Sequence, residues 1–92
     1  MSSVLVDGLG IDVDGFLCVP APRDGAHVAI RFRTDALLHH DAGVPLGREV
    51  QLGFGVSGSV YQGTFRLTAF TPGPGPGRYR FISVGPIVRL SR

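Results

Sequence analysis

Apolar and polar residues alternate with a period of two along several stretches of this chain, a pattern typical of β-strands with one buried face. The clearest example is AHVAIRFR at residues 26–33, in which Val28, Ile30 and Phe32 alternate with small or polar residues. The two arginines of this segment fall on the opposite side of the strand. The segment therefore predicts a strand with an apolar inner face and a mostly polar outer face.

Three later segments repeat this pattern: REVQLGF at residues 48–54, SVYQGTFRLTAFT at 59–71 and RYRFISV at 78–84. The second is rich in β-branched and aromatic residues, which favour strands. Gly63, in its middle, predicts a bulge or a sharp bend. The expected core consists of the apolar residues on the buried faces, namely Val28, Ile30, Phe32, Val50, Leu52, Phe54, Phe65, Leu67 and Phe81.

Glycine and proline interrupt the chain too often for a long helix, because its 14 glycines and 7 prolines break every apolar pattern within about two turns. Asp7-Gly8 and Asp14-Gly15 divide the N-terminal third into three short strands or one bent ribbon. The Pro-Gly run at residues 71–77 predicts the tip of a hairpin. We expect one all-β domain over residues 1–92, a small antiparallel β-sandwich or partly open β-barrel of about six to eight short strands. At most one helical turn is expected, near residues 34–40.

The composition indicates a surface that contacts other molecules. Hydrophobic residues make up 43% of the chain and charged residues only 17%, against roughly 25% charged residues in ordinary soluble domains. All nine basic residues are arginine, but the net charge of +2 is small for a dedicated nucleic-acid binder. The single cysteine, Cys18, and an N-terminus without the features of a signal peptide predict a protein of the cytoplasm or of an assembled particle.

A glycine-rich stretch resembles a nucleotide-binding loop but lacks the residues that such a loop requires. Gly53, Gly55 and Gly58, followed by Val60, fit the G-x-G-x-x-G-x-V loop that protein kinases fold over ATP. Kinase chemistry also needs a lysine, which this chain does not contain. Ser57, in GVSGS, narrowly misses the G-x-S-x-G nucleophile elbow, which also needs a helix after it. We interpret the stretch as a hairpin, and we predict neither a catalytic residue nor a cofactor.

Two groups of side chains have the donor atoms of a metal site without the usual spacing. They are Asp7, Asp12 and Asp14 in DGLGIDVDG, and His39, His40 and Asp41, with His27 on the neighbouring strand. The first group lacks the EF-hand spacing and its bidentate glutamate. Adjacent histidines on an extended chain point to opposite sides, and no third zinc ligand is identifiable. No metal site is predicted, and whether either group ever binds a metal stays open.

Arginines flank an aromatic residue in two segments, RFR at residues 31–33 and RYR at 78–80. On a strand, two arginines that are two residues apart share one face and can both contact phosphates, while an exposed ring stacks on a base. The Pro-Gly tip is expected to project toward a neighbouring subunit. The candidate interaction surface is therefore Arg31, Arg33, Pro74, Pro76, Arg78, Tyr79 and Arg80.

The leading functional expectation is a protein that is not an enzyme. The low charge, the apolar surplus and the missing catalytic constellation favour a structural or adaptor subunit of a multi-subunit assembly, for example an accessory protein of a phage or other particle. Its expected partners are copies of itself or a larger protein, with no membrane and no cofactor. The alternative is a small β-barrel that binds single-stranded nucleic acid through its arginines and tyrosine.

Overall fold

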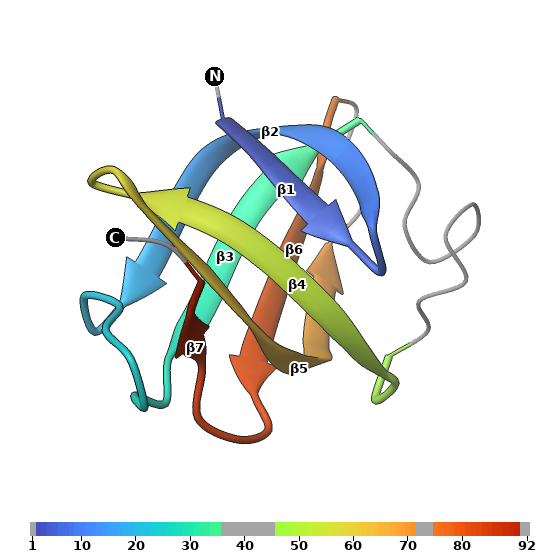
Figure 1. Cartoon of the computed structure of the whole chain (residues 1–92). Helices are drawn as coiled ribbons and strands as arrows, with labels where there is room; N and C mark the ends of the chain where they lie inside the picture. The colour runs from blue at the N-terminus through green and yellow to red at the C-terminus, as the bar shows by residue number, and fades with distance from the viewer. Residues whose placement is uncertain (1, 36–45, 72–74, 91–92) are drawn as a thin grey trace.

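The computed structural model describes residues 2–35, 46–71 and 75–90, which form seven β-strands and no helix. All pairings are antiparallel, and the first six strands close into a barrel (Figure 1). The all-β expectation is therefore confirmed. The strands are β1 (Ser2–Val6), β2 (Leu9–Val19), β3 (Ala29–Thr34), β4 (Glu49–Val56), β5 (Ser59–Thr71), β6 (Gly77–Ser83) and β7 (Val88–Arg89).

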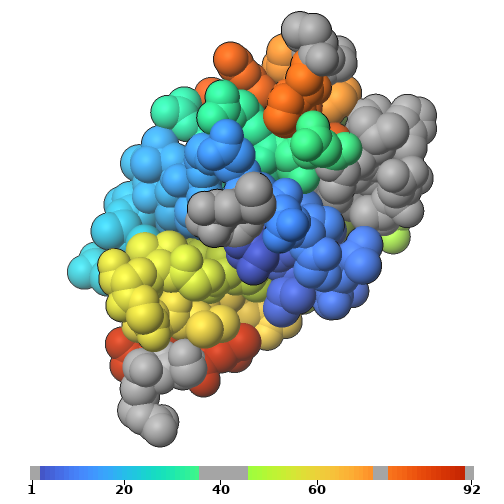
Figure 2. Space-filling view, turned by 90° about the horizontal axis from the view of Figure 1, so that it is seen from above, coloured from blue at the N-terminus to red at the C-terminus, as the bar shows by residue number. Residues whose placement is uncertain are grey.

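The first four strands form a Greek key, because β1, β2 and β3 are neighbours in sequence order and β4 returns to pair with β1. In Figure 2 the blue residues of β1 and β2 lie between the green residues of β3 and the yellow residues around the β4–β5 turn. Hairpins then connect β4 to β5 and β5 to β6, and the β3–β6 pairing closes the barrel. The short β7 pairs with the first half of β5 outside the closed ring.

Two tight hairpin turns confirm the turn chemistry of the sequence. Asp7 and Gly8 connect β1 to β2 with φ angles of 51° and 85°, and Ser57 and Gly58 connect β4 to β5 with φ angles of 53° and 81°. Positive φ at both central residues is the type I′ geometry, which matches the twist of paired strands. The stretch that resembles a kinase loop is thus a β-hairpin, as expected.

Asp14-Gly15 is not a turn, so the three-strand interpretation of the N-terminal third is wrong. β2 is continuous through this dipeptide, and its register with β3 shifts between Asp14 and Leu17. Gly15 has a φ of 66°, which a β-bulge uses as readily as a turn does.

Gly63 was expected to mark an irregularity in β5, but its register with β4 is regular. The register shift of β5 occurs later, between Leu67 and Ala69 on its pairing with β6. Gly63 instead permits close packing, because a Cβ atom there would lie 3.0 Å from Cγ2 of the fully buried Ile87.

The nine predicted core residues are all buried inside the barrel. Six further residues complete the core, and they are Val4, Val6, Val13, Tyr61, Tyr79 and Ile87. Tyr79 had been expected on the surface, yet only 2% of it is exposed and its ring centroid lies 4.8 Å from that of Phe70. Because side chains alternate across a strand, two outward arginines force the residue between them inward.

Part of the sequence prediction lies outside the described residues. The helical turn near residues 34–40 falls mostly there, while Thr34 ends β3. The hairpin with the Pro-Gly tip is confirmed at its base, where Thr71 pairs with Arg78.

Candidate interaction surface

The outer face of β2, β3 and β6 carries apolar and charged side chains, which form three rows that run across the strands. Strand register fixes these rows, because residues that share a row are direct pairing partners. The rows are Val19, Ala29 and Ile82; Leu17, Arg31 and Arg80; and Asp14, Arg33 and Arg78. We call the surface formed by Leu17, Val19, Ala29, Arg31, Arg33, Arg78, Arg80 and Ile82 the basic-apolar face.

The structure brings the two arginine segments of the sequence side by side. Arg31 lies opposite Arg80 and Arg33 lies opposite Arg78, and all four are exposed. Like charges that are directly opposite one another destabilise a sheet. The four arginines therefore concentrate positive charge at a cost to the stability of the barrel.

Only one of these arginines has a carboxylate partner among the described residues. Nη2 of Arg33 donates to Oδ2 of Asp14 at 2.7 Å, across the bulge in β2. Both side chains of this pair are well exposed, at 46% and 68%, so solvent weakens the interaction. A further ion pair joins Arg66 to Glu49, away from this arginine cluster. The guanidinium groups of Arg31, Arg78 and Arg80 thus lack ion pairs with the described part of the chain.

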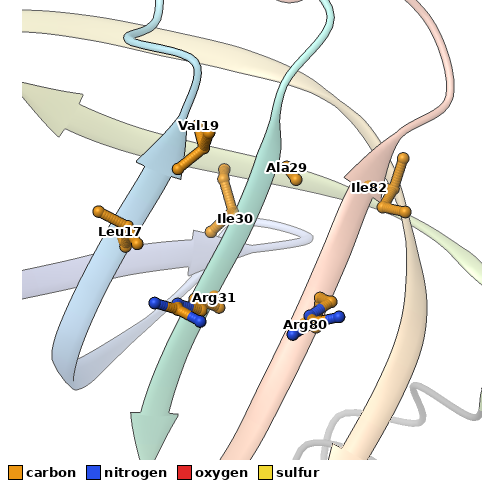
Figure 3. Close-up of a pocket in the computed structure, with 7 residues that line it drawn as sticks. All are labelled: Leu17, Val19, Ala29, Ile30, Arg31, Arg80 and Ile82. Atoms are coloured by element: carbon orange, nitrogen blue, oxygen red, sulfur yellow. The ribbon is translucent and has the colours of Figure 1, made fainter.

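An apolar hollow of about 340 Å³ lies beside the arginines (Figure 3). Leu17 and Val19 reach it from β2 and Ile82 from β6, and these side chains are 41%, 55% and 47% exposed. Arg31 and Arg80 line the same hollow. The face is therefore apolar at one end and basic at the other, with the Arg31–Arg80 pair where the two parts meet.

Further hollows continue over the arginine rows. One of about 330 Å³ is lined by Arg31, Arg33 and Arg78 together with Gly15. Another of about 300 Å³ extends toward β5, where Thr71 and Ala69 join its lining. The hollows make the basic part of the face uneven, with room for a chain laid over it.

The expectation of an exposed stacking ring is wrong for Tyr79, which is only 2% exposed. Phe32 is also 2% exposed, as its predicted place in the core requires, and the two ring centroids lie 6.1 Å apart inside the barrel. Pro76 is exposed just before β6, whereas Pro74 lies outside the described residues. Among the residues of the predicted surface, the four arginines lie together on the outer face, whereas Tyr79 is buried.

Leu17, Val19 and Ile82 were missed by the sequence prediction. The sequence pattern indicated that Ile82 points outward, because Ile82 follows Arg78 and Arg80 with the same period of two. For Leu17 and Val19 the pattern was ambiguous, since the whole run FLCV is apolar.

Two of the candidate metal ligands, Asp7 and Asp14, stabilise the fold through their side chains. Oδ1 of Asp7 accepts the backbone N–H of Gln51 at 2.9 Å and so ties the first hairpin to β4. Asp14 is paired with Arg33. Within residues 2–35, 46–71 and 75–90, no three His, Cys, Asp or Glu side chains lie close enough to hold a metal ion. His39, His40 and Asp41 lie outside these ranges.

Cys18 is a partly buried free thiol that lies behind the apolar end of the face. Its Sγ lies 3.6 Å from the carbonyl oxygen of Pro20. Burial raises the pKa of this thiol, because a thiolate is disfavoured away from water.

Fold and surface together define the class of the molecule, a small closed all-β barrel with a basic-apolar outer face. The chain matches no family model, no curated protein and no solved structure. The described part of the chain includes no helix that is long and apolar enough to cross a membrane.

Proposed function

We propose that this chain is a non-catalytic structural or adaptor subunit of a multi-subunit assembly, such as an accessory protein of a phage or other particle, and that it acts through protein–protein contacts. In this proposal it works in the cytoplasm or within the assembled particle. The observation that carries the proposal is the apolar hollow, where Leu17, Val19 and Ile82 from two strands of one face remain about half exposed. Clustered apolar exposure of this kind is typical of interaction sites.

Strand pairing covers only part of the strand edges. Each of the first six strands pairs with two others, but β2 pairs only with β3 from Asp14 to Val19, and β5 pairs only with β6 from Ala69 to Thr71. Next to β7, Ile87 N–H donates to the Ala26 carbonyl and Gly25 N–H donates to the Ile87 carbonyl. Strand addition needs an unpaired edge, whereas this proposal uses the exposed side chains of the outer face. The partner contacts the side chains of the outer face.

Capture of partners from the native source tests this proposal. The wild-type chain is expected to retain a protein partner or to form a particle heavier than the 9.7 kDa monomer. Ile82→Gln is expected to lose the partner, because it puts a polar amide into the hollow. Val88→Gln is the matched control, since Val88 is 53% exposed on β7 and does not line the hollow. A monomer without a partner, or equal retention by both variants, would contradict the proposal.

Single-stranded nucleic acid is the second candidate, and the pairing of Arg31 with Arg80 and of Arg33 with Arg78 favours it. Titration with a thymidine oligonucleotide at several salt concentrations tests it. If all four arginines contact phosphates, the logarithm of the association constant falls against log salt with a slope of about −3, from about −0.7 for each phosphate. Absence of binding at low salt would exclude this function.

A further inference from the structure

We infer that the basic-apolar face binds an extended acidic segment of another protein, with one large aliphatic side chain in the hollow and acidic side chains at alternate positions over the arginines. This inference rests on the proposed adaptor function and adds the chemistry of the partner. The recognition pattern is aliphatic-x-acid-x-acid, where x is any residue.

The spacing of the pattern follows from the strand repeat. Ala29, Arg31 and Arg33 are successive outward residues of β3, and Ile82, Arg80 and Arg78 face them on β6 in the same rows. Successive residues on one face of a strand lie about 6.6–6.8 Å apart. An extended segment laid along β3 and β6 presents every second side chain at the same repeat. Its aliphatic residue then meets the apolar row, and the next two residues on that face meet the two arginine pairs.

Charge selects acidic residues for the second and third positions. Arg31, Arg78 and Arg80 form no ion pair with a described carboxylate, although they lie in directly opposed pairs. A carboxylate between two opposed guanidinium groups removes their repulsion and accepts charge-assisted hydrogen bonds from both. Binding therefore offsets an unfavourable interaction that exists in the free chain.

The hollow selects an aliphatic residue for the first position. Its apolar lining comes from Leu17, Val19 and Ile82, and it opens directly onto Arg31 and Arg80. An aliphatic side chain that enters it covers these exposed groups without leaving a polar atom unpaired.

A nucleic acid matches this face less well than an acidic peptide does. Phosphates would neutralise the arginines but leave the hollow without an apolar group to fill it. The rings of Phe32 and Tyr79, which a base would stack on, are buried inside the barrel.

Two other occupants also match less well. A second copy of the chain that docked through this same face would oppose its own arginines, and Asp14, the carboxylate in the same row as Arg33 and Arg78, is already paired with Arg33. A bilayer favours protruding apolar side chains, whereas Leu17, Val19 and Ile82 line a recess. Each occupant is an arm of the test below.

The test is a titration of a synthetic peptide that contains Leu-Ser-Glu-Ser-Glu into the isotope-labelled full chain, followed by amide chemical shifts in NMR spectra. Three control peptides remove one feature each. Leu-Ser-Gln-Ser-Gln lacks the charge, Ser-Ser-Glu-Ser-Glu lacks the aliphatic group, and Leu-Glu-Ser-Glu-Ser places the acids on the opposite side of an extended chain. A thymidine oligonucleotide and vesicles of anionic phospholipid are titrated in parallel, and spectra of the chain alone at increasing concentration report binding of a second copy.

The expected result is shifts confined to β2, β3 and β6, and an affinity for the first peptide at least about threefold above that for each control. Arg80→Gln is expected to lower the affinity by a similar factor, whereas Arg89→Gln leaves it unchanged, because Arg89 lies on β7 outside the face. Amide spectra of the variants establish that both are folded.

The inference is overturned if the glutamine peptide binds equally well, if Arg80→Gln has no effect, or if only the oligonucleotide, the vesicles or a second copy of the chain binds. Its failure can be separated from failure of the adaptor function. If Ile82→Gln still abolishes partner capture while acidic peptides do not bind, the adaptor function stands and the partner chemistry is wrong. If Ile82→Gln captures partners normally, the adaptor function itself is wrong.

Discussion

Removing one arginine from the face is expected to stabilise the free barrel. Arg80→Gln eliminates the repulsion from Arg31, its direct partner on β3, and breaks no ion pair with a described residue. A like-charged pair that is directly opposed across two strands costs about 0.2–1 kcal/mol. For a chain of this size, that gain corresponds to an increase in Tm of about 1–8 °C.

Urea unfolding at low salt and again at high salt measures the effect. The gain in the free energy of unfolding should shrink as salt rises, because exposed charges are screened over about 10 Å at 0.1 M ionic strength. Arg33→Gln is the matched control, since it relieves the repulsion from Arg78 but also breaks the ion pair with Asp14. It should gain less than Arg80→Gln. A loss of stability in Arg80→Gln at low salt, or a gain that does not depend on salt, would refute the argument.

Three further predictions concern the interior of the barrel. Ser83→Ala should lower the free energy of unfolding by about 1–3 kcal/mol, because the Ser83 hydroxyl accepts the buried N–H of Val28 at 2.9 Å. Gly63→Ala should cost about 1–3 kcal/mol by overpacking, since its new Cβ would lie 3.0 Å from Ile87, which is fully buried. The Cys18 thiol should react with iodoacetamide more slowly in the folded chain than in urea, because burial raises its pKa and limits its access.

Each of the two substitutions has a matched control. Ser3→Ala removes a hydroxyl from an exposed position, and Gly75→Ala adds a Cβ with no atom within 4 Å. Both should leave the urea midpoint nearly unchanged. If either control is as destabilising as its buried counterpart, the local contact is not the cause. Equal alkylation rates in buffer and in urea would contradict the prediction for the thiol.

Local sequence pattern was sufficient for most of the strands and for the core. The alternation in residues 26–33 and 48–54 predicted β3 and β4 with the correct inner faces, because a period of two leaves only one way to bury Val28 or Leu52. The prediction of a turn at Asp14-Gly15 was wrong, since a glycine with positive φ occurs in a bulge as well as in a turn. Strand order could not be predicted either, because the β1–β4 and β3–β6 pairings join residues far apart in the sequence.

The sequence predicted the two arginine segments of the candidate surface but not their arrangement on one face. The two arginine segments were recognised, but their assembly into one cluster depends on the register between β3 and β6, which puts Arg31 opposite Arg80. The inward position of Tyr79 was predictable from the same alternation that places its neighbouring arginines outside. The apolar hollow needed the three-dimensional arrangement, because Leu17 and Ile82 belong to strands that are not neighbours.

Photo-crosslinking from the face inside the native host tests the central claim most directly. We would replace Ile82 with benzoylphenylalanine, and in a second chain replace the similarly exposed Val88 on β7 in the same way. The account predicts that the probe at Ile82 forms an adduct with another protein, through a segment with alternating acidic residues, and that the probe at Val88 does not form this adduct. An adduct with nucleic acid, no adduct, or the same adduct from both positions would contradict it.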